Sequence, residues 1–180
     1  AFAALKRDGS VVTWGSDYSG GNSTSVASAL SSNVIAVHSN SEAFAALKKD
    51  GSVVTWGSDY SGGNSTSVAG ALSSNVTAIC ANEDAFAALK KDGSVVTWGQ
   101  EYSGGNSTSV AFGLSSNVTA VYSNESAFAA LKKDGSVVTW GSDYSGGNST
   151  SVASALSSNV TAVYSSRTAF AALKRDGSVV

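Results

Sequence analysis

The feature that most constrains this chain is an internal repeat of 42 residues. The string Ala-Phe-Ala-Ala-Leu-Lys begins at Ala1, Ala43, Ala85, Ala127 and Ala169. Repetition at such a period is typical of proteins in which each repeat buries its apolar face against its neighbours. Units this similar cannot hold several different active sites, so any site is either repeated or confined to positions where the copies differ. We divide the single repeat domain into four repeats and a closing partial repeat: 1–42, 43–84, 85–126, 127–168 and 169–180.

Each repeat contains the pattern of several short β-strands. Residues 52–56 (SVVTW) are rich in β-branched and aromatic residues, and residues 43–48 (AFAALK) precede them. Lys49-Asp50-Gly51 between these runs is a strong hairpin signal, because glycine tolerates positive φ. Residues 118–122 (VTAVY) alternate as a half-buried strand would, whereas residues 67–72 (SVAGAL) fit either an outer strand or a single helical turn. Three or four antiparallel strands per repeat predict an all-β fold, a β-propeller, with a parallel β-helix as the alternative.

The repeat also resembles a known family. The residues that carry the resemblance are Val118-x-x-Val121, Ala127 to Leu131, Asp134-Gly135-Ser136-Val137, Trp140-Gly141 and Gly146-Gly147. They are similar to the repeat of the regulator-of-chromosome-condensation propeller superfamily, above all to its bacterial branch of β-lactamase-inhibitor propellers and long surface proteins. The resemblance covers all four repeats and implies a propeller.

This sequence departs from the family in two ways. The family's usual Gly and His before the Ala-Leu strand are absent here, and family members carry more blades of longer repeat. Eukaryotic members act as exchange factors for a small GTPase, but no motif for that role is matched in this sequence.

The two ends of the chain suggest how the repeats could be arranged. The N-terminus lacks the VTAVY strand that precedes AFAALK in every other copy, and the C-terminus has that strand plus one further hairpin segment, 169–180. One blade shared between both ends would close a ring within the chain. Two chains could instead pair into one larger ring, since four blades is at the low end for propellers. The offset, with the missing initiator Met, equally fits a segment excised from a longer array or an engineered protein.

Composition excludes several classes of protein. The formal net charge of −2 provides no basic field for a nucleic-acid backbone. With 42% hydrophobic and 13% charged residues, the chain is too apolar for a disordered protein. No apolar run approaches the length of a membrane helix, and a lone cysteine excludes an intrachain disulfide framework. We therefore expect no nucleic-acid partner and no membrane insertion.

Basic residues recur in doublets, once per repeat, next to an aspartate. We expect these doublets at solvated hairpin tips, where they form a ring of charge on one face and discourage pairing between sheet edges. The doublets hold ten of the eleven basic residues: Lys6-Arg7, Lys48-Lys49, Lys90-Lys91, Lys132-Lys133 and Lys174-Arg175.

Catalytic and metal-binding chemistry finds little support. The only imidazole, His38, and the only thiol, Cys80, occupy one repeat position that is filled by Tyr122 and Tyr164 in the other copies. A position that accepts His, Cys and Tyr is not specified for catalysis, and neighbouring blades would hold the two groups too far apart for a dyad. The segment 59–64 resembles a calcium loop but supplies one carboxylate, so it is better interpreted as a turn. We predict that the chain is not an enzyme and has no cofactor and no metal.

One tryptophan occurs at the same strand position of each repeat: Trp14, Trp56, Trp98 and Trp140. Such residues could bind sugars, but a large aromatic at a fixed strand position is more often packed between blades. We therefore predict that the tryptophans belong to the core.

The copies differ most in the last six positions of each repeat. In a propeller the loop after VTAVY joins two strands, so its four tips would share one face and could bind a partner. Drift of exposed loops after duplication would give the same variation. The candidate partner-binding residues are His38, Asn40, Glu42, Cys80, Asn82, Glu83, Asp84, Tyr122, Asn124, Glu125, Tyr164, Ser166, Arg167 and Thr168.

Three functional hypotheses follow. The first is a non-enzymatic structural or interaction module from a repetitive bacterial protein, in an extracellular or cell-surface setting, with its partner on the variable loops. The second is an engineered or excised repeat whose only activity is self-assembly into a closed ring, as a homodimer or a larger ring. The third is a multivalent glycan-binding lectin with one weak site per blade.

Overall fold

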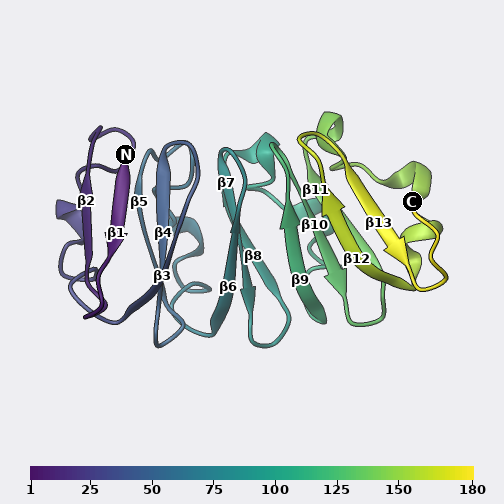
Figure 1. Cartoon of the computed structure of the whole chain (residues 1–180), viewed down its shortest axis with the longest axis horizontal. Coiled ribbons are helices and arrows are strands. Elements are labelled where there is room, and N and C mark those ends of the chain that lie inside the picture. Colours follow the sequence, from purple (N-terminus) through teal and green to yellow (C-terminus); the bar gives the residue numbers. More distant parts are fainter.

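A computed structural model describes all 180 residues as a row of five small antiparallel sheets (Figure 1). The sheets are, in chain order, β1–β2, β3-β4-β5, β6-β7-β8, β9-β10-β11 and β12–β13. The strands are β1 Phe2–Leu5, β2 Val11–Trp14, β3 Val34–Ser39, β4 Ala43–Lys48, β5 Val53–Gly57, β6 Val76–Ala81, β7 Ala85–Lys90, β8 Val95–Gly99, β9 Val118–Ser123, β10 Ala127–Lys132, β11 Val137–Gly141, β12 Val160–Ser165 and β13 Phe170–Lys174.

The predicted hairpin forms in each repeat. In the second repeat, Lys48 to Gly51 turns the chain between β4 and β5, with Gly51 at φ +79°. The carboxylate of Asp50 accepts hydrogen bonds from the amide and the hydroxyl of Ser52, at 2.9 and 2.7 Å. Phe44 lies opposite Trp56 in the register, and their rings stack with centroids 5.1 Å apart. The turn therefore sets a register that places both aromatic rings on one face of the blade.

The segment 67–72, which the sequence left open, is a helical turn and not a fourth strand. A 3-10 helix spans Thr66–Val68, and the side chain of Asn64 accepts from the Thr66 amide at 3.0 Å. Leu72 then turns inward and is almost fully buried, while its carbonyl accepts from the amide of Val53 at 3.0 Å. The segment thus covers the outer strand without pairing along it, so each complete blade has three strands. The other 3-10 helices are Thr24–Val26, Glu101–Ser103, Thr108–Val110, Asp143–Ser145, Thr150–Val152 and Ala155–Ser157.

The core lies between consecutive blades. Phe86 and Trp98 of the third repeat pack against alanines and Leu72 of the second. The indole Nε1 of Trp98 donates to the carbonyl of Gly62, at 3.0 Å. The predicted packing of tryptophans between blades is therefore confirmed for Trp98, and Trp56 and Trp140 repeat it. The tryptophan of the first repeat differs, because its side chain lies at the end of the row.

The row of blades is open. Strand β1 pairs only with β2, and β12 pairs only with β13. The two termini lie at opposite ends of the molecule (Figure 1). Residues 169–180 therefore do not close a ring within the chain, because β13 pairs with β12 at the C-terminal end of the row, far from β1 at the other end. The structure is a segment of a propeller whose two end faces are unpaired.

Candidate partner-binding edge

The variable loops and the turns that follow the tryptophan strands lie together along one edge of the row. Around the blade β3-β4-β5, the side chain of Asn40 donates to the carbonyl of Ser61 at 2.7 Å, and the amide of Ser58 donates to the carbonyl of Glu42 at 2.9 Å. We call this surface the loop edge. It comprises loops 40–42, 82–84, 124–126 and 166–168 and turns 16–21, 58–63, 100–105 and 142–147.

Backbone hydrogen bonds connect the four loops in sequence. The amide of Ser41 donates to the carbonyl of Glu83 at 3.1 Å, and the amide of Glu83 donates to the carbonyl of Glu125, also at 3.1 Å. The amide of Glu125 in turn donates to the carbonyl of Arg167 at 3.0 Å. Residues 42 positions apart are thereby held side by side. The loops lie in a row on one edge, as the repeat predicts, and each is fixed by its neighbours.

One ion pair reinforces this row at its C-terminal end. The guanidinium of Arg167 donates to both carboxylate oxygens of Glu125, at 3.0 and 2.7 Å. The hydrogen bond and the positive charge lower the pKa of Glu125. Arg167 remains highly exposed, so part of its guanidinium is open to a partner.

The asparagines among the candidate residues serve the fold. Asn82 is 7% exposed, its Nδ2 donates to the carbonyl of Ser103, and its Oδ1 accepts from the amides of Asp84 and Ala85. Asn40 and Asn124 make the same set of bonds. The side-chain amides of all three are therefore occupied by hydrogen bonds within the fold.

In the last repeat a serine takes the place of this asparagine. The hydroxyl of Ser166 donates to the carbonyl of Ala169 at 3.4 Å, and both Ser166 and Thr168 are exposed.

The position shared by His38, Cys80, Tyr122 and Tyr164 lies on the strands that precede the loops. Burial lowers the pKa of His38 and raises the pKa of the Cys80 thiol. The thiol donates to the hydroxyl of Ser123, at 3.3 Å, and no hydrogen bond joins it to His38. Tyr122 is half-buried, and only Tyr164 is well exposed, at the end of the row. These four residues therefore do not assemble into one site.

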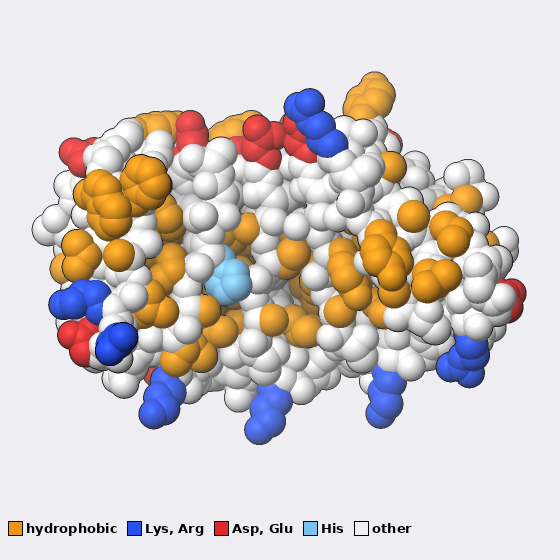
Figure 2. All heavy atoms as spheres, viewed as in Figure 1, with side chains coloured by type: hydrophobic (Ala, Val, Ile, Leu, Met, Phe, Trp, Pro, Cys, Tyr) orange, Lys and Arg blue, Asp and Glu red, His pale blue; other side chains and the backbone are white.

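Charge is strongly divided between the two edges. The loop edge carries eight of the thirteen acidic residues and one of the eleven basic residues, a formal charge of −7. The opposite edge carries five aspartates and ten basic residues, a formal charge of +5. Figure 2 shows most of the visible lysines and arginines along the lower edge, and most of the visible acidic groups along the upper one together with a single basic side chain. The acidic residues of the loop edge are Asp17, Glu42, Asp59, Glu83, Asp84, Glu101, Glu125 and Asp143.

The basic doublets are only partly the solvated tips that the sequence predicted. The first lysine of a doublet reaches back to the preceding repeat: Lys48 Nζ donates to the carbonyl of Ala29, and Lys90 Nζ to that of Ala71, at 2.8 and 2.7 Å. The second residue, such as Lys49, is exposed. One member of each central doublet therefore connects blades.

Four exposed tyrosines on the loop edge were not among the candidates from sequence. Tyr18, Tyr60, Tyr102 and Tyr144 are 65%, 60%, 79% and 97% exposed, and each directly follows an acidic residue. This tyrosine is invariant among the copies, so only the lectin hypothesis involved it, whereas the candidate partner-binding residues lie at positions that vary. An aromatic residue inside a Gly- and Ser-rich turn was the available signal.

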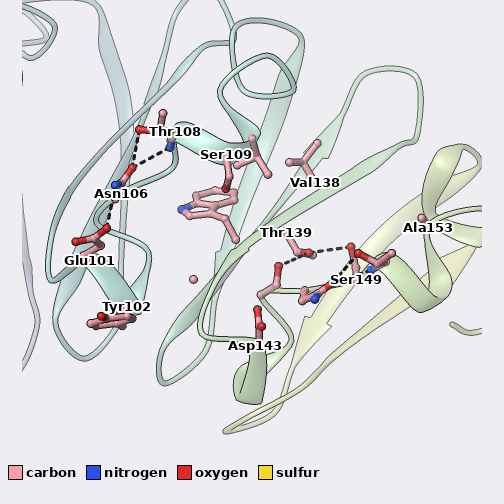
Figure 3. Close-up of a pocket in the computed structure, with 16 residues that line it drawn as sticks. Glu101, Tyr102, Asn106, Thr108, Ser109, Val138, Thr139, Asp143, Ser149 and Ala153 are labelled. Carbon is pink, nitrogen blue, oxygen red and sulfur yellow. Dashed lines mark hydrogen bonds between the residues drawn. The ribbon is translucent and has the colours of Figure 1, made fainter.

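A groove lies between the third and fourth blades and is lined by one of these tyrosines, Tyr102 (Figure 3). Its volume is about 940 Å³, with Glu101 and Tyr102 on one wall and Asp143 on the other. The hydroxyl of Thr139 donates to Ser149 at 2.9 Å, so polar groups of the wall largely bond one another. The groove contains no nucleophile beside a base, and it offers acidic, amide and aromatic contacts.

Comparison with known proteins identifies the fold. No protein-family profile matches the chain, and no curated protein matches it. Among solved structures, Prp20p of Saccharomyces cerevisiae aligns with 98% of this chain and 53% of its own, at a TM-score of 0.59 and 18% identity. Yeast RCC1 (Prp20), in a complex with Kap60, aligns with 98% of this chain and 52% of its own, at a TM-score of 0.58 and 19% identity. Human WBSCR16 aligns with 77% of this chain and 44% of its own, at a TM-score of 0.53 and 23% identity.

These likenesses define the class of fold. The chain has an all-β fold of the β-propeller class, as the sequence predicted. It spans about half the length of the structures that it matches. No helix of the structure has both the length and the apolar character needed to cross a membrane.

Proposed function

We propose that the chain is a non-enzymatic protein-interaction module whose loop edge binds a basic partner. The observation that carries this proposal is the concentration of acidic residues and exposed tyrosines on one edge. Complementary charge accelerates and selects encounters, and tyrosines supply much of the binding energy of protein interfaces.

The rigidity of the loop edge supports the proposal. The backbone bonds between neighbouring loops order the surface before a partner arrives, so less conformational entropy is lost on binding. The candidate residues retained are the exposed or half-exposed Glu42, Glu83, Asp84, Glu125 and Arg167.

The solved neighbours are consistent with a protein partner. The structure of Prp20p is described with its binding to Gsp1p and histones, and yeast RCC1 is described as bound by Kap60. The proposal that this chain binds a protein is supported by the shared fold and by the acidic loop edge of this chain. A bacterial extracellular or cell-surface setting remains part of the proposal, on the strength of the repeat and its low charge content.

A matched pair of triple variants tests the proposal. The first neutralises the loop edge with Asp59→Asn, Glu83→Gln and Glu101→Gln. Titration of a short lysine- and serine-containing peptide at low salt should show binding to the parent chain that weakens with added salt. The loop-edge variant should bind about tenfold more weakly, because three attractive charges are removed.

The control changes net charge equally on the opposite edge, with Asp50→Asn, Asp92→Asn and Asp134→Asn. It should bind the peptide within about threefold of the parent chain. Equal loss in both variants would show that only net charge matters and would overturn the proposed edge. A glycan array with the parent chain tests the lectin hypothesis, since sugar binding that survives in the loop-edge variant would favour it.

A further inference from the structure

The N-terminal end face of the row is apolar and uncovered. Phe2, Val12 and Trp14 are 65%, 51% and 51% exposed, whereas Trp56, at the equivalent position of the next blade, is 3% exposed. The indole of Trp56 donates to the carbonyl of Gly20 in the preceding repeat, and Trp14 has no such acceptor. This face is therefore one half of an inter-blade contact.

The C-terminal end presents the other half. A pocket of about 190 Å³ is lined by mostly apolar residues, among them Val152 and Phe170, and by Gly146. At the equivalent place in the preceding repeat, the carbonyl of Gly104 accepts from the indole of Trp140 at 3.1 Å. No side chain bonds the carbonyl of Gly146. A cavity of about 150 Å³ can hold a benzene ring, so this pocket has room for an aromatic side chain.

The incomplete blades at the two ends complement each other in sequence and in strands. Residues 1–12 are identical to residues 169–180, and they continue with Thr13, Trp14 and Gly15. The first blade has only β1 and β2, and the last has β12 and β13 with one isolated bridge beyond them. Joined as β12-β1-β2, they would form a three-stranded blade of the same order as β3-β4-β5.

We propose that a second copy of this chain docks head to tail, with its residues 1–15 taking the place of residues 169–180 beside β12. Each contact made by the twelve shared residues is kept in this exchange, because the two segments are identical. Trp14 of the incoming copy enters the pocket and donates its Nε1–H to the carbonyl of Gly146, and Phe2 and Val12 become buried.

The occupant is a second copy and not the same chain. The two ends lie at opposite ends of the row, so residues 1–15 cannot reach β12 of their own chain (Figure 1). The docked copy also continues the inter-blade interface already formed three times within the chain, with the same residue types at the same spacing. The loop edges of the two copies would then follow one another without a break.

Molar mass measured by light scattering across a concentration series tests the proposal. The chain of 180 residues should show a mass in whole multiples of 18.0 kDa, and Trp14→Ala should return it toward 18.0 kDa. We expect Trp14→Ala to weaken association about 25-fold or more, as for the loss of a central aromatic at an interface. Tyr60→Ala, which removes an exposed aromatic from the loop edge, should leave the mass unchanged.

A peptide of residues 1–15 provides the second measurement. It should compete for the place beside β12 and dissociate the assembly, while the same peptide with Trp14→Ala should have little effect. A mass of 18.0 kDa at every concentration would overturn the proposal. So would an assembly that is insensitive both to Trp14→Ala and to the peptide.

Discussion

Substitution of Gly62 by alanine should destabilise the chain strongly. Gly62 has φ +92°, a conformation that costs a residue with a Cβ about 1–2 kcal/mol. A Cβ built there would lie 2.9 Å from Phe86 and 3.1 Å from Trp98. Both rings are buried, so relieving the overlap should cost a further ~1–3 kcal/mol. We expect Gly62→Ala to lower the free energy of unfolding by about 2–5 kcal/mol.

Two other glycines supply matched controls, and the free energy of unfolding of each variant is measured by urea denaturation monitored through fluorescence. Gly70 lies outside the left-handed region, a Cβ there meets nothing within 4 Å, and Gly70→Ala should stabilise by about 0.4–1 kcal/mol. Gly146 has φ +83°, but within one chain its Cβ would meet only Phe170, at 3.1 Å, so for the dissociated chain Gly146→Ala should fall between the other two. Equal stabilities for Gly62→Ala and Gly70→Ala would refute the inter-blade packing described above.

Three further predictions concern single side chains. Asn82→Ala should lower the free energy of unfolding by about 2–4 kcal/mol, because it leaves buried backbone groups unpaired. Glu83→Ala on the same loop should change the free energy of unfolding by less than ~0.5 kcal/mol, and chemical denaturation of the two variants measures the difference. The hydrogen bonds from Ser52 hold the pKa of Asp50 below its ordinary value. They therefore stabilise the folded state fully at pH values above that ordinary pKa, and this stabilisation is lost as pH falls through the pKa of Asp50 in the folded state. Carboxyl NMR titration should show Ser52→Ala raising the pKa of Asp50, and an unchanged value would contradict the assignment. The Cys80 thiol should react with a thiol reagent much more slowly in the native chain than in urea, because burial limits the access of the reagent and raises the pKa of the thiol. Equal reaction rates would show that Cys80 is accessible on β6 in the native chain.

Much of the fold was predictable because the local signals agree. An Asp-Gly turn between two apolar runs sets the hairpin, and its recurrence at one spacing shows that the unit packs against copies of itself. The segment 67–72 was not predictable, since its final structure depends on burying Leu72 beneath the outer strand, a tertiary contact. The solvent exposure of Trp14 likewise depends on the end of the row being open.

The candidate site was predicted only in part. Sequence variation drew attention to the loop edge, which the loop-to-loop hydrogen bonds show to be one continuous surface. It could not distinguish Asn82, whose amide is used by the fold, from Glu83, which is exposed. Nor could it find Tyr102, because the accessibility of a turn residue depends on how neighbouring blades are placed.

Fluorine NMR of the chain labelled with fluorotyrosine would test the central claim most directly. Addition of the lysine- and serine-containing peptide should shift the signals of Tyr18, Tyr60, Tyr102 and Tyr144 on the loop edge. The signal of Tyr122, half-buried on its strand, serves as the internal control and should stay in place. Saturable, salt-sensitive shifts confined to the four edge tyrosines would support the proposed binding surface. Peptide binding that leaves those four signals unmoved would contradict it.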